Sequence, residues 1–191
     1  MKWVSHQLVT ATGVYALTGS SLAAVLAGAF ATLPDKIDIL CGAFGGKAIH
    51  LFSHRKHSHY WGYWFIISAC SLMYLKTHGL MLASAGEYVA TLTSALDGNP
   101  RLACETILVN LAFWATLGSC LHIFEDFFSG MGVPLAVPTR ISPHLRLYKT
   151  GSFSETLCTT VAVATGLYFS FAANVPYRES IRGAVSGLLF G

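Results

Sequence analysis

The chain has 191 residues, of which 53% are hydrophobic and only 11% are charged, and its mean hydropathy is +0.55. A soluble domain carries about 25% charged residues, so this composition predicts an integral membrane protein with a single domain spanning residues 1–191. The formal net charge of +3 is small, and the basic residues are scattered among apolar segments, which argues against a nucleic-acid-binding protein.

The first apolar segment, Gln7 to Leu33, predicts a helical hairpin. As one straight helix it would be about 40 Å long and would cross a hydrocarbon core of about 30 Å, so that His6 and Asp35 would lie on opposite sides. Gly19-Ser20-Ser21 near its middle favours a break. We therefore expect two arms of about 12 to 14 residues that are re-entrant or packed within a bundle, with a straight span as the alternative.

The middle of the chain predicts two membrane spans joined by a helix on the far surface. Residues 36 to 53 contain three glycines and predict a connector with a short amphipathic turn. The apolar run from 60 to 82 is long enough to span, and its aromatic start suits the membrane interface. Ser84-Ala85-Gly86-Glu87 matches a capping box and predicts the far-side helix, and residues 102 to 124 form the return span.

The C-terminal third predicts a loop, a last span and a helix on the membrane surface. Glycines and prolines between residues 129 and 148 favour a loop. Residues 156 to 175 are apolar enough for a span, and residues 177 to 191 have the charged and apolar faces of an interfacial helix. We therefore expect an all-α, polytopic membrane helical bundle with an N-terminal helical hairpin and interfacial helices.

The densest group of potential metal ligands is His54-Arg55-Lys56-His57-Ser58-His59, just before the first of these spans. Neutral imidazole is the commonest protein metal ligand, and three histidines in six positions are unusual. A basic loop that contacts lipid headgroups is the alternative. Further nitrogen and oxygen ligands border other apolar runs, at His6, Asp35, Asp38, His122 and Asp126.

His122 and Asp126 lie at the end of the return span, on the expected side of the His54 to His59 segment. Because they are four residues apart, they share one face of a helix. An ionisable pair in or beside a membrane segment is functional by default. A simple hydrogen bond between His122 and another helix is the alternative.

Together these motifs resemble the YdjM-like family of inner-membrane proteins, which are expected to be membrane-bound metal-dependent hydrolases. The family pattern has an early histidine, a Pro-Asp motif with a second aspartate, a His-Arg-x-x-Thr/Ser-His motif, a His-x-x-x-Asp motif followed by Gly and Pro, and a Thr-Gly-Ser-x-x-Glu motif. This chain has the same order: His6, Pro34-Asp35-Lys36-Ile37-Asp38, His54 to His59, His122 to Asp126 with Gly130 to Pro134, and Thr150 to Glu155. The commoner family form has one residue between the two aspartates, and this chain has two.

The resemblance and the ligand types imply a hydrolytic site with one or two divalent ions, zinc foremost and manganese as the alternative. The expected ligands are His6, Asp35, His54, His59, His122 and Asp126. Asp38 is either a further ligand or the base that orients the attacking water, and Arg55 is expected to hold a phosphoryl oxygen. His57 and Ser58 are expected to donate to ligand carboxylates. Glu155 is expected to belong to a capping box, with a role beside the ligands as the alternative.

The expected partners are membrane lipids and an amphiphilic or phosphorylated substrate. Lys and Arg are more numerous on the proposed metal side, so the positive-inside rule predicts a site that faces the cytoplasm from a bacterial inner membrane. The order of ligands is loosely similar to that of zinc-dependent phospholipases C, which favours a phosphoester lipid. A metal-stabilised scaffold or adaptor is the alternative. A metal-ion transporter ranks last, because its ligands would lie near the membrane midplane.

Overall fold

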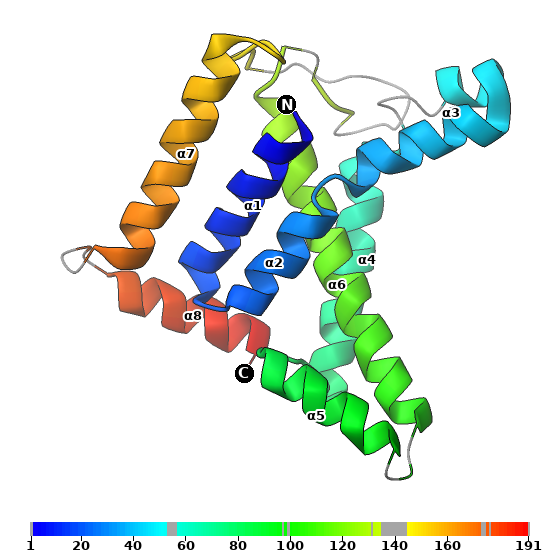
Figure 1. The fold of residues 1–191 in the computed structure, drawn as a ribbon, viewed down its shortest axis with the longest axis vertical. Coiled ribbons are helices and arrows are strands. Elements are labelled where there is room, and N and C mark those ends of the chain that lie inside the picture. Colours follow the sequence, from blue (N-terminus) through cyan, green and yellow to red (C-terminus); the bar gives the residue numbers. More distant parts are fainter. Residues whose placement is uncertain are drawn as a thin grey trace.

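The computed structural model describes residues 2–52, 57–96, 98, 100–130, 132–134, 145–172, 175 and 177–190, and the side chains within them except those of 45–52 and 96. The described part of the chain is helical and contains no strand (Figure 1). Its elements are α1 (Trp3–Thr18), α2 (Ser21–Phe30), α3 (Leu33–Phe52), α4 (Trp61–His78), α5 (Ala85–Leu96), α6 (Pro100–Phe127), α7 (Phe153–Phe171) and α8 (Arg178–Phe190).

The predicted N-terminal hairpin is present, with arms of 16 and 10 residues formed by α1 and α2. Gly19 ends α1 with φ 72°, a left-handed conformation that glycine adopts without a Cβ clash. The Ser20 side chain caps α2 by accepting a hydrogen bond from the backbone N–H of Ala23 at 3.1 Å. The hairpin therefore returns the chain to the end of the molecule at which α1 begins (Figure 1).

The predicted connector over residues 36 to 53 is wrong, because α3 is a continuous helix of 20 residues. An interior glycine costs a helix only about 1 kcal/mol, so the three glycines of this segment do not prevent it. Pro34 lies in the first turn of α3, where a missing N–H breaks no intrahelical hydrogen bond. The helix start places Asp35 and Asp38 one turn apart.

The long helix α6 is the centre of the fold. It has 28 residues and is longer at both ends than predicted, and α4, α5 and α2 pack along it. Fully buried Asn110 joins it to the chain after α4, accepting from the backbone N–H of Leu82 at 3.0 Å and donating to the carbonyl of Leu80 at 2.8 Å. Before α5, the predicted capping box is present, because Ser84 and Glu87 each accept from the other's backbone N–H.

The core lies between α2 and α6. Ala23, Ala24 and Ala27 form the buried face of α2, and Phe113 and Trp114 of α6 pack against this region. The small side chains allow a close approach, so that a Cβ added at Gly118 would overlap the carbonyl oxygen of Ala27. This contact sets how closely α6 approaches α2.

Among the described residues, α6 is the one helix that is both long and apolar enough to cross a membrane. The predicted spans at 60–82 and 156–175 correspond to α4 and α7, which have 18 and 19 residues. Both are long enough to cross a membrane, but neither meets the combined requirement of length and apolar composition that α6 meets. A polytopic arrangement therefore stays a prediction. Large apolar side chains are exposed on both, including Phe65, Ile66 and Met73 of α4 and Val161 of α7.

The last two helices enclose the hairpin. α7 packs against α1, and α8 crosses the opposite end of the hairpin from the N-terminus (Figure 1). Arg182 of α8 donates from Nε to the carbonyl of Ala16 at 2.9 Å and lies over the Tyr15 ring. These contacts leave the start of α1, the start of α3 and the end of α6 gathered at one end of the molecule.

Candidate metal centre

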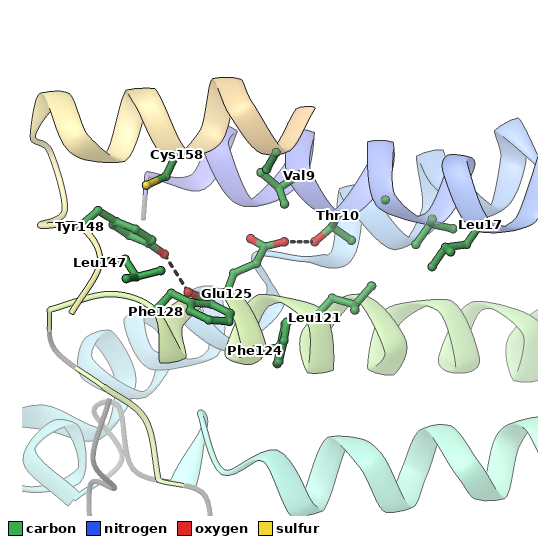
Figure 2. A pocket seen from close by; sticks show the side chains of 13 residues that line it. Val9, Thr10, Leu17, Leu121, Phe124, Glu125, Phe128, Leu147, Tyr148 and Cys158 are labelled. Atoms are coloured by element: carbon green, nitrogen blue, oxygen red, sulfur yellow. Dashed lines mark hydrogen bonds between the residues drawn. The ribbon is translucent and has the colours of Figure 1, made fainter. Parts of the chain in front are cut away.

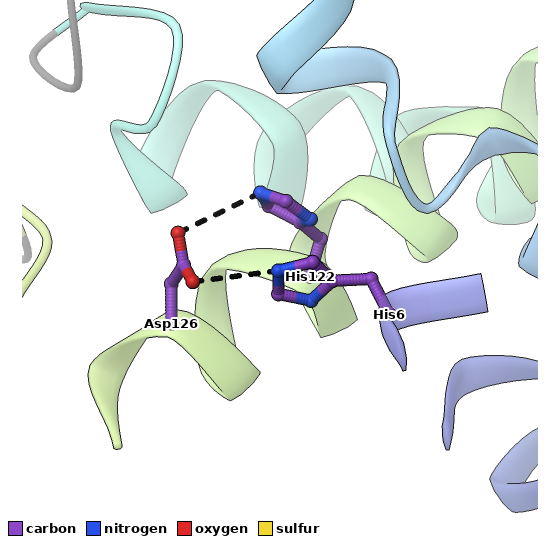
Figure 3. A group of neighbouring side chains, drawn as sticks. All are labelled: His6, His122 and Asp126. Carbon is purple, nitrogen blue, oxygen red and sulfur yellow. Dashed lines mark ion pairs between the residues drawn. The ribbon is translucent and has the colours of Figure 1, made fainter. Parts of the chain in front are cut away.

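Imidazole and carboxylate groups from four parts of the chain meet at this end. His6 lies in the first turns of α1, Asp35 in the first turn of α3, His59 just before α4, and His122 and Asp126 near the end of α6. Two groups each offer one ligand atom per residue within 4.8 Å of the others: His6, His122 and Asp126, shown in Figure 3, and Asp35, His59 and His122. The side chains of His6, His59, His122 and Asp126 are fully buried.

Short distances also join His59 and His122 to the carboxylates of Asp35 and Asp126. His59 Nε2 lies 3.2 Å from Asp35 Oδ1, 3.4 Å from His122 Nε2 and 3.9 Å from Asp126 Oδ2. His122 Nε2 is 3.7 Å from both Asp35 Oδ1 and Asp126 Oδ2. The two imidazole nitrogens thus lie between the two carboxylates, and His122 belongs to both three-residue groups.

The separations within each three-residue group suit ligands of one cation. With metal–ligand bonds of about 2.0 to 2.2 Å, adjacent ligand atoms of a tetrahedral zinc site lie about 3.3 to 3.6 Å apart. The observed distances of 3.2 to 3.9 Å bracket that range. The buried Nε2 of His6 and Nδ1 of His122 also lack a hydrogen-bond partner among the described residues. The residues present therefore could hold a divalent ion.

His6 is held toward the cluster by a second carboxylate. Its Nδ1 lies 2.6 Å from Glu125 Oε2, and an ionised carboxylate can only accept, so Nδ1 carries the proton and Nε2 presents its lone pair. That Nε2 lies 3.4 Å from Asp126 Oδ1. The Thr10 hydroxyl donates to the other Glu125 oxygen at 2.9 Å. Asp126 thus faces His6 with one oxygen and His59 and His122 with the other, as a carboxylate that bridges two ions would.

His59 is oriented from behind in a similar way. Its Nδ1 lies 2.9 Å from the Ser58 hydroxyl and 3.7 Å from Asp38 Oδ2. The Ser58 hydroxyl in turn donates to Asp38 Oδ1 at 2.6 Å. Such partners fix the ring orientation and tautomer of a histidine that binds a metal. Asp38 therefore lies behind His59 and belongs to neither three-residue group.

Asp35 is the ligand group that is most open to solvent, with 20% of its side chain exposed. Burial alone would raise the pKa of its carboxyl, but the hydrogen bond with His59 and the charges of His122 and His59 outweigh burial. The pKa of Asp35 is consequently lowered below its ordinary value. The group is ionised at neutral pH, as cation binding requires.

Two other predicted site residues, His57 and Glu155, lie outside the two groups of ligand atoms. His54 and Arg55 lie outside the described residues. The His57 ring is stacked beside Tyr63, with ring centroids 6.5 Å apart. The Glu155 carboxylate accepts hydrogen bonds from the backbone N–H groups of Lys2 and Gly151, so it joins the start of α7 to the start of α1. Ser152 caps α7 as the motif predicts.

Sequence analysis missed two residues of this site. Glu125 was visible only as the neighbour of Asp126, and Thr10 as one polar residue in an apolar segment. A signal for Glu125 did exist, because it lies three residues after His122 and therefore shares part of its helix face. Nothing comparable marks Thr10.

Comparison with known proteins gives one finding. The family model described as YdjM inner membrane protein matches residues 1–189. No curated protein and no solved structure matches the chain.

Proposed function

The chain belongs to the YdjM family of inner membrane proteins, and we propose that it is a membrane-bound metal-dependent hydrolase acting on a phosphoester of an amphiphilic substrate. The observation that carries this proposal is the pair of adjoining groups, His6, His122 and Asp126 on one side and Asp35, His59 and His122 on the other, that share His122. A histidine and carboxylate set without cysteine suits zinc, with manganese as the second choice.

A bound divalent ion would lower the pKa of a coordinated water to about 7 and would polarise a phosphoryl oxygen. Neighbouring residues orient the histidine rings that would bind the ion. Ser58 and Asp38 hold the His59 ring, while Thr10 and Glu125 hold the His6 ring. Since Asp35 is the exposed member of the cluster, we place the substrate on its side. Arg55 remains our proposed residue for holding a phosphoryl oxygen, and His54 remains a proposed metal ligand.

The proposed substrate class follows from location. Family membership places the protein in the inner membrane, and α6, which carries His122 and Asp126, is its candidate membrane span. Both residues lie within the last two turns of that helix, and we propose that this end lies at the depth where a lipid headgroup meets its chains. We propose that this end faces the cytoplasm, in accordance with the Lys and Arg distribution.

The test is turnover by purified protein in nanodiscs supplied with zinc or manganese, against a panel of lipid phosphoesters. We expect turnover that depends on metal and disappears in His122→Ala and in Asp126→Asn. The matched control is His78→Ala, because His78 is an exposed histidine stacked on Tyr74 at the far end of α4. Tight metal binding without turnover of any member of the panel would contradict the proposal.

The second candidate is a metal-stabilised scaffold without catalysis. It is favoured by one observation: the ligand groups come from α1, α3, α6 and the segment before α4, so an ion would fasten these parts together. It predicts that a chelator unfolds the protein cooperatively and that no variant of the cluster changes any turnover. A hydrolase would retain its fold after chelation and lose only activity.

A further inference from the structure

A cavity of about 430 Å³ lies beside the metal centre, between α1, α6 and α7 (Figure 2). Residues 147 and 148 close it at the end where α7 begins, and Leu17 of α1 lies at its other end. Pockets of about 300 to 1,000 Å³ are the usual size for small-molecule sites. None of the cluster ligands lines this cavity, so it is a separate feature of the fold.

The cavity wall is almost entirely hydrocarbon, and its few polar groups already have partners. Thr10 donates to Glu125 Oε1 at 2.9 Å, and the other Glu125 oxygen is held by His6. The Tyr148 hydroxyl donates to the Glu125 carbonyl at 2.7 Å. The Cys158 thiol behaves as a small apolar group. A ligand would therefore gain little from polar atoms here and much from the burial of apolar surface.

The length of the cavity suits a hydrocarbon chain. Along α1 the wall runs from Val9 to Leu17, which is about 12 Å at 1.5 Å per residue. α6, which forms the facing wall through Leu121 and Phe124, is the candidate membrane span. The cavity is therefore bordered by the candidate membrane span, and in a membrane hydrocarbon chains are the abundant ligand.

Glu125 connects this cavity to the metal centre. It lines the cavity and also contacts His6 of the cluster, at 2.6 Å. We propose that the cavity binds one hydrocarbon chain of the amphiphile whose polar group is held at the metal centre. This deepens and rests on the proposed function, because it assigns the substrate a long alkyl or prenyl chain.

Gly13 offers a way to fill the cavity without disturbing its wall. It lies on α1 in the cavity lining, and a Cβ added there would meet nothing within 4 Å. Gly13→Leu therefore places a side chain in the cavity and also raises helix propensity. Ala162→Leu on α7 fills the cavity from the opposite wall. The matched control is Gly183→Leu, since Gly183 is also a helical glycine with open space but lies on α8.

The probe is hexadecyl phosphate with a photoreactive diazirine at the end of its chain, added to purified protein in phosphatidylcholine nanodiscs. Mass spectrometry maps the labelled residues. We expect labels on the cavity residues of α1, α6 and α7, competed by unlabelled hexadecyl phosphate and not by butyl phosphate. Gly13→Leu and Ala162→Leu should each reduce cavity labelling by about tenfold or more, because contacts with several methylenes are lost. Gly183→Leu should label as the unmodified protein does.

The same labelling is repeated on metal-free protein and on His122→Ala, which separates this inference from the proposed function. Cavity labelling that persists in these two inactive proteins shows that the chain site does not depend on turnover. If the metal-loaded unmodified protein is labelled in the cavity but hydrolyses no member of the lipid panel, the chain site is supported and the hydrolase is contradicted. Labels spread evenly over exposed apolar surfaces, or equal in Gly13→Leu and the unmodified protein, overturn the chain site even where hydrolysis is observed.

Discussion

Glu125→Gln is expected to weaken zinc binding while leaving the fold intact. The glutamine keeps the size of the side chain and removes the negative charge that faces His6 Nδ1 at 2.6 Å. A hydrogen bond to a charged group contributes about 1.5 to 3 kcal/mol and a neutral one about 1 kcal/mol. The difference of about 0.5 to 2 kcal/mol corresponds to about a 2- to 30-fold higher Kd for zinc. Partners behind a metal-binding histidine typically change affinity by about 10- to 100-fold.

Competition with a chromophoric chelator at neutral pH measures this Kd in the purified protein. The matched control is Glu105→Gln, because Glu105 is also a carboxylate on α6 and accepts a hydrogen bond from Tyr74, but lies near the other end of that helix. Thr10→Val, which removes the hydroxyl that donates to Glu125, should give a smaller effect of the same sign.

Two results would refute the reasoning. If Glu125→Gln bound zinc as tightly as the unmodified protein, the contact with His6 would not orient a ligand. If it lost as much affinity as Asp126→Asn, Glu125 would itself be a ligand, and the arrangement of His6 would have to be revised.

Three further predictions address the packing and the supports of the site. Gly118→Ala should destabilise the protein by about 1 to 3 kcal/mol, because its Cβ would overlap the Ala27 carbonyl. Gly13→Ala, where the added Cβ meets open space, should be neutral or stabilising. The thermal unfolding midpoints of the two variants measure this difference in stability. Ser58→Ala should raise the Kd for zinc by about 10-fold, because it removes the hydroxyl between Asp38 and His59; an unchanged Kd would mean that this hydroxyl does not position the ring. Burial raises the pKa of Glu155, but hydrogen bonds from the backbone N–H groups of Lys2 and Gly151 outweigh burial and hold that pKa below its ordinary value of 4.5. The ionised Glu155 carboxylate therefore stabilises the fold fully above about pH 4.5, and this stabilisation is lost as the pH falls through the lower folded-state pKa. Glu155→Gln should be about 1 to 2 kcal/mol less stable than the unmodified protein at pH 7, and this difference in stability should shrink on acidification. A difference that does not depend on pH would contradict this role.

Local sequence signals predicted the features that depend on neighbouring residues. Gly19-Ser20-Ser21 predicted the hairpin because a left-handed glycine and a serine cap act within one turn of the helix. The hairpin in turn placed His6 and Asp35 at one end of the molecule. The spacing of His122 and Asp126 predicted a shared helix face for the same reason.

Tertiary structure decided the features that depend on residues distant in the chain. α3 continues through three glycines that, as isolated signals, favoured a connector. Glu125 acquires its role only because α1 brings His6 within 2.6 Å across 119 residues of sequence. The cavity likewise exists only where α1, α6 and α7 fail to fill the space between them. Capping and helix periodicity are short-range and can be read from a few residues, whereas contacts and cavities between helices arise from packing, which no single segment encodes.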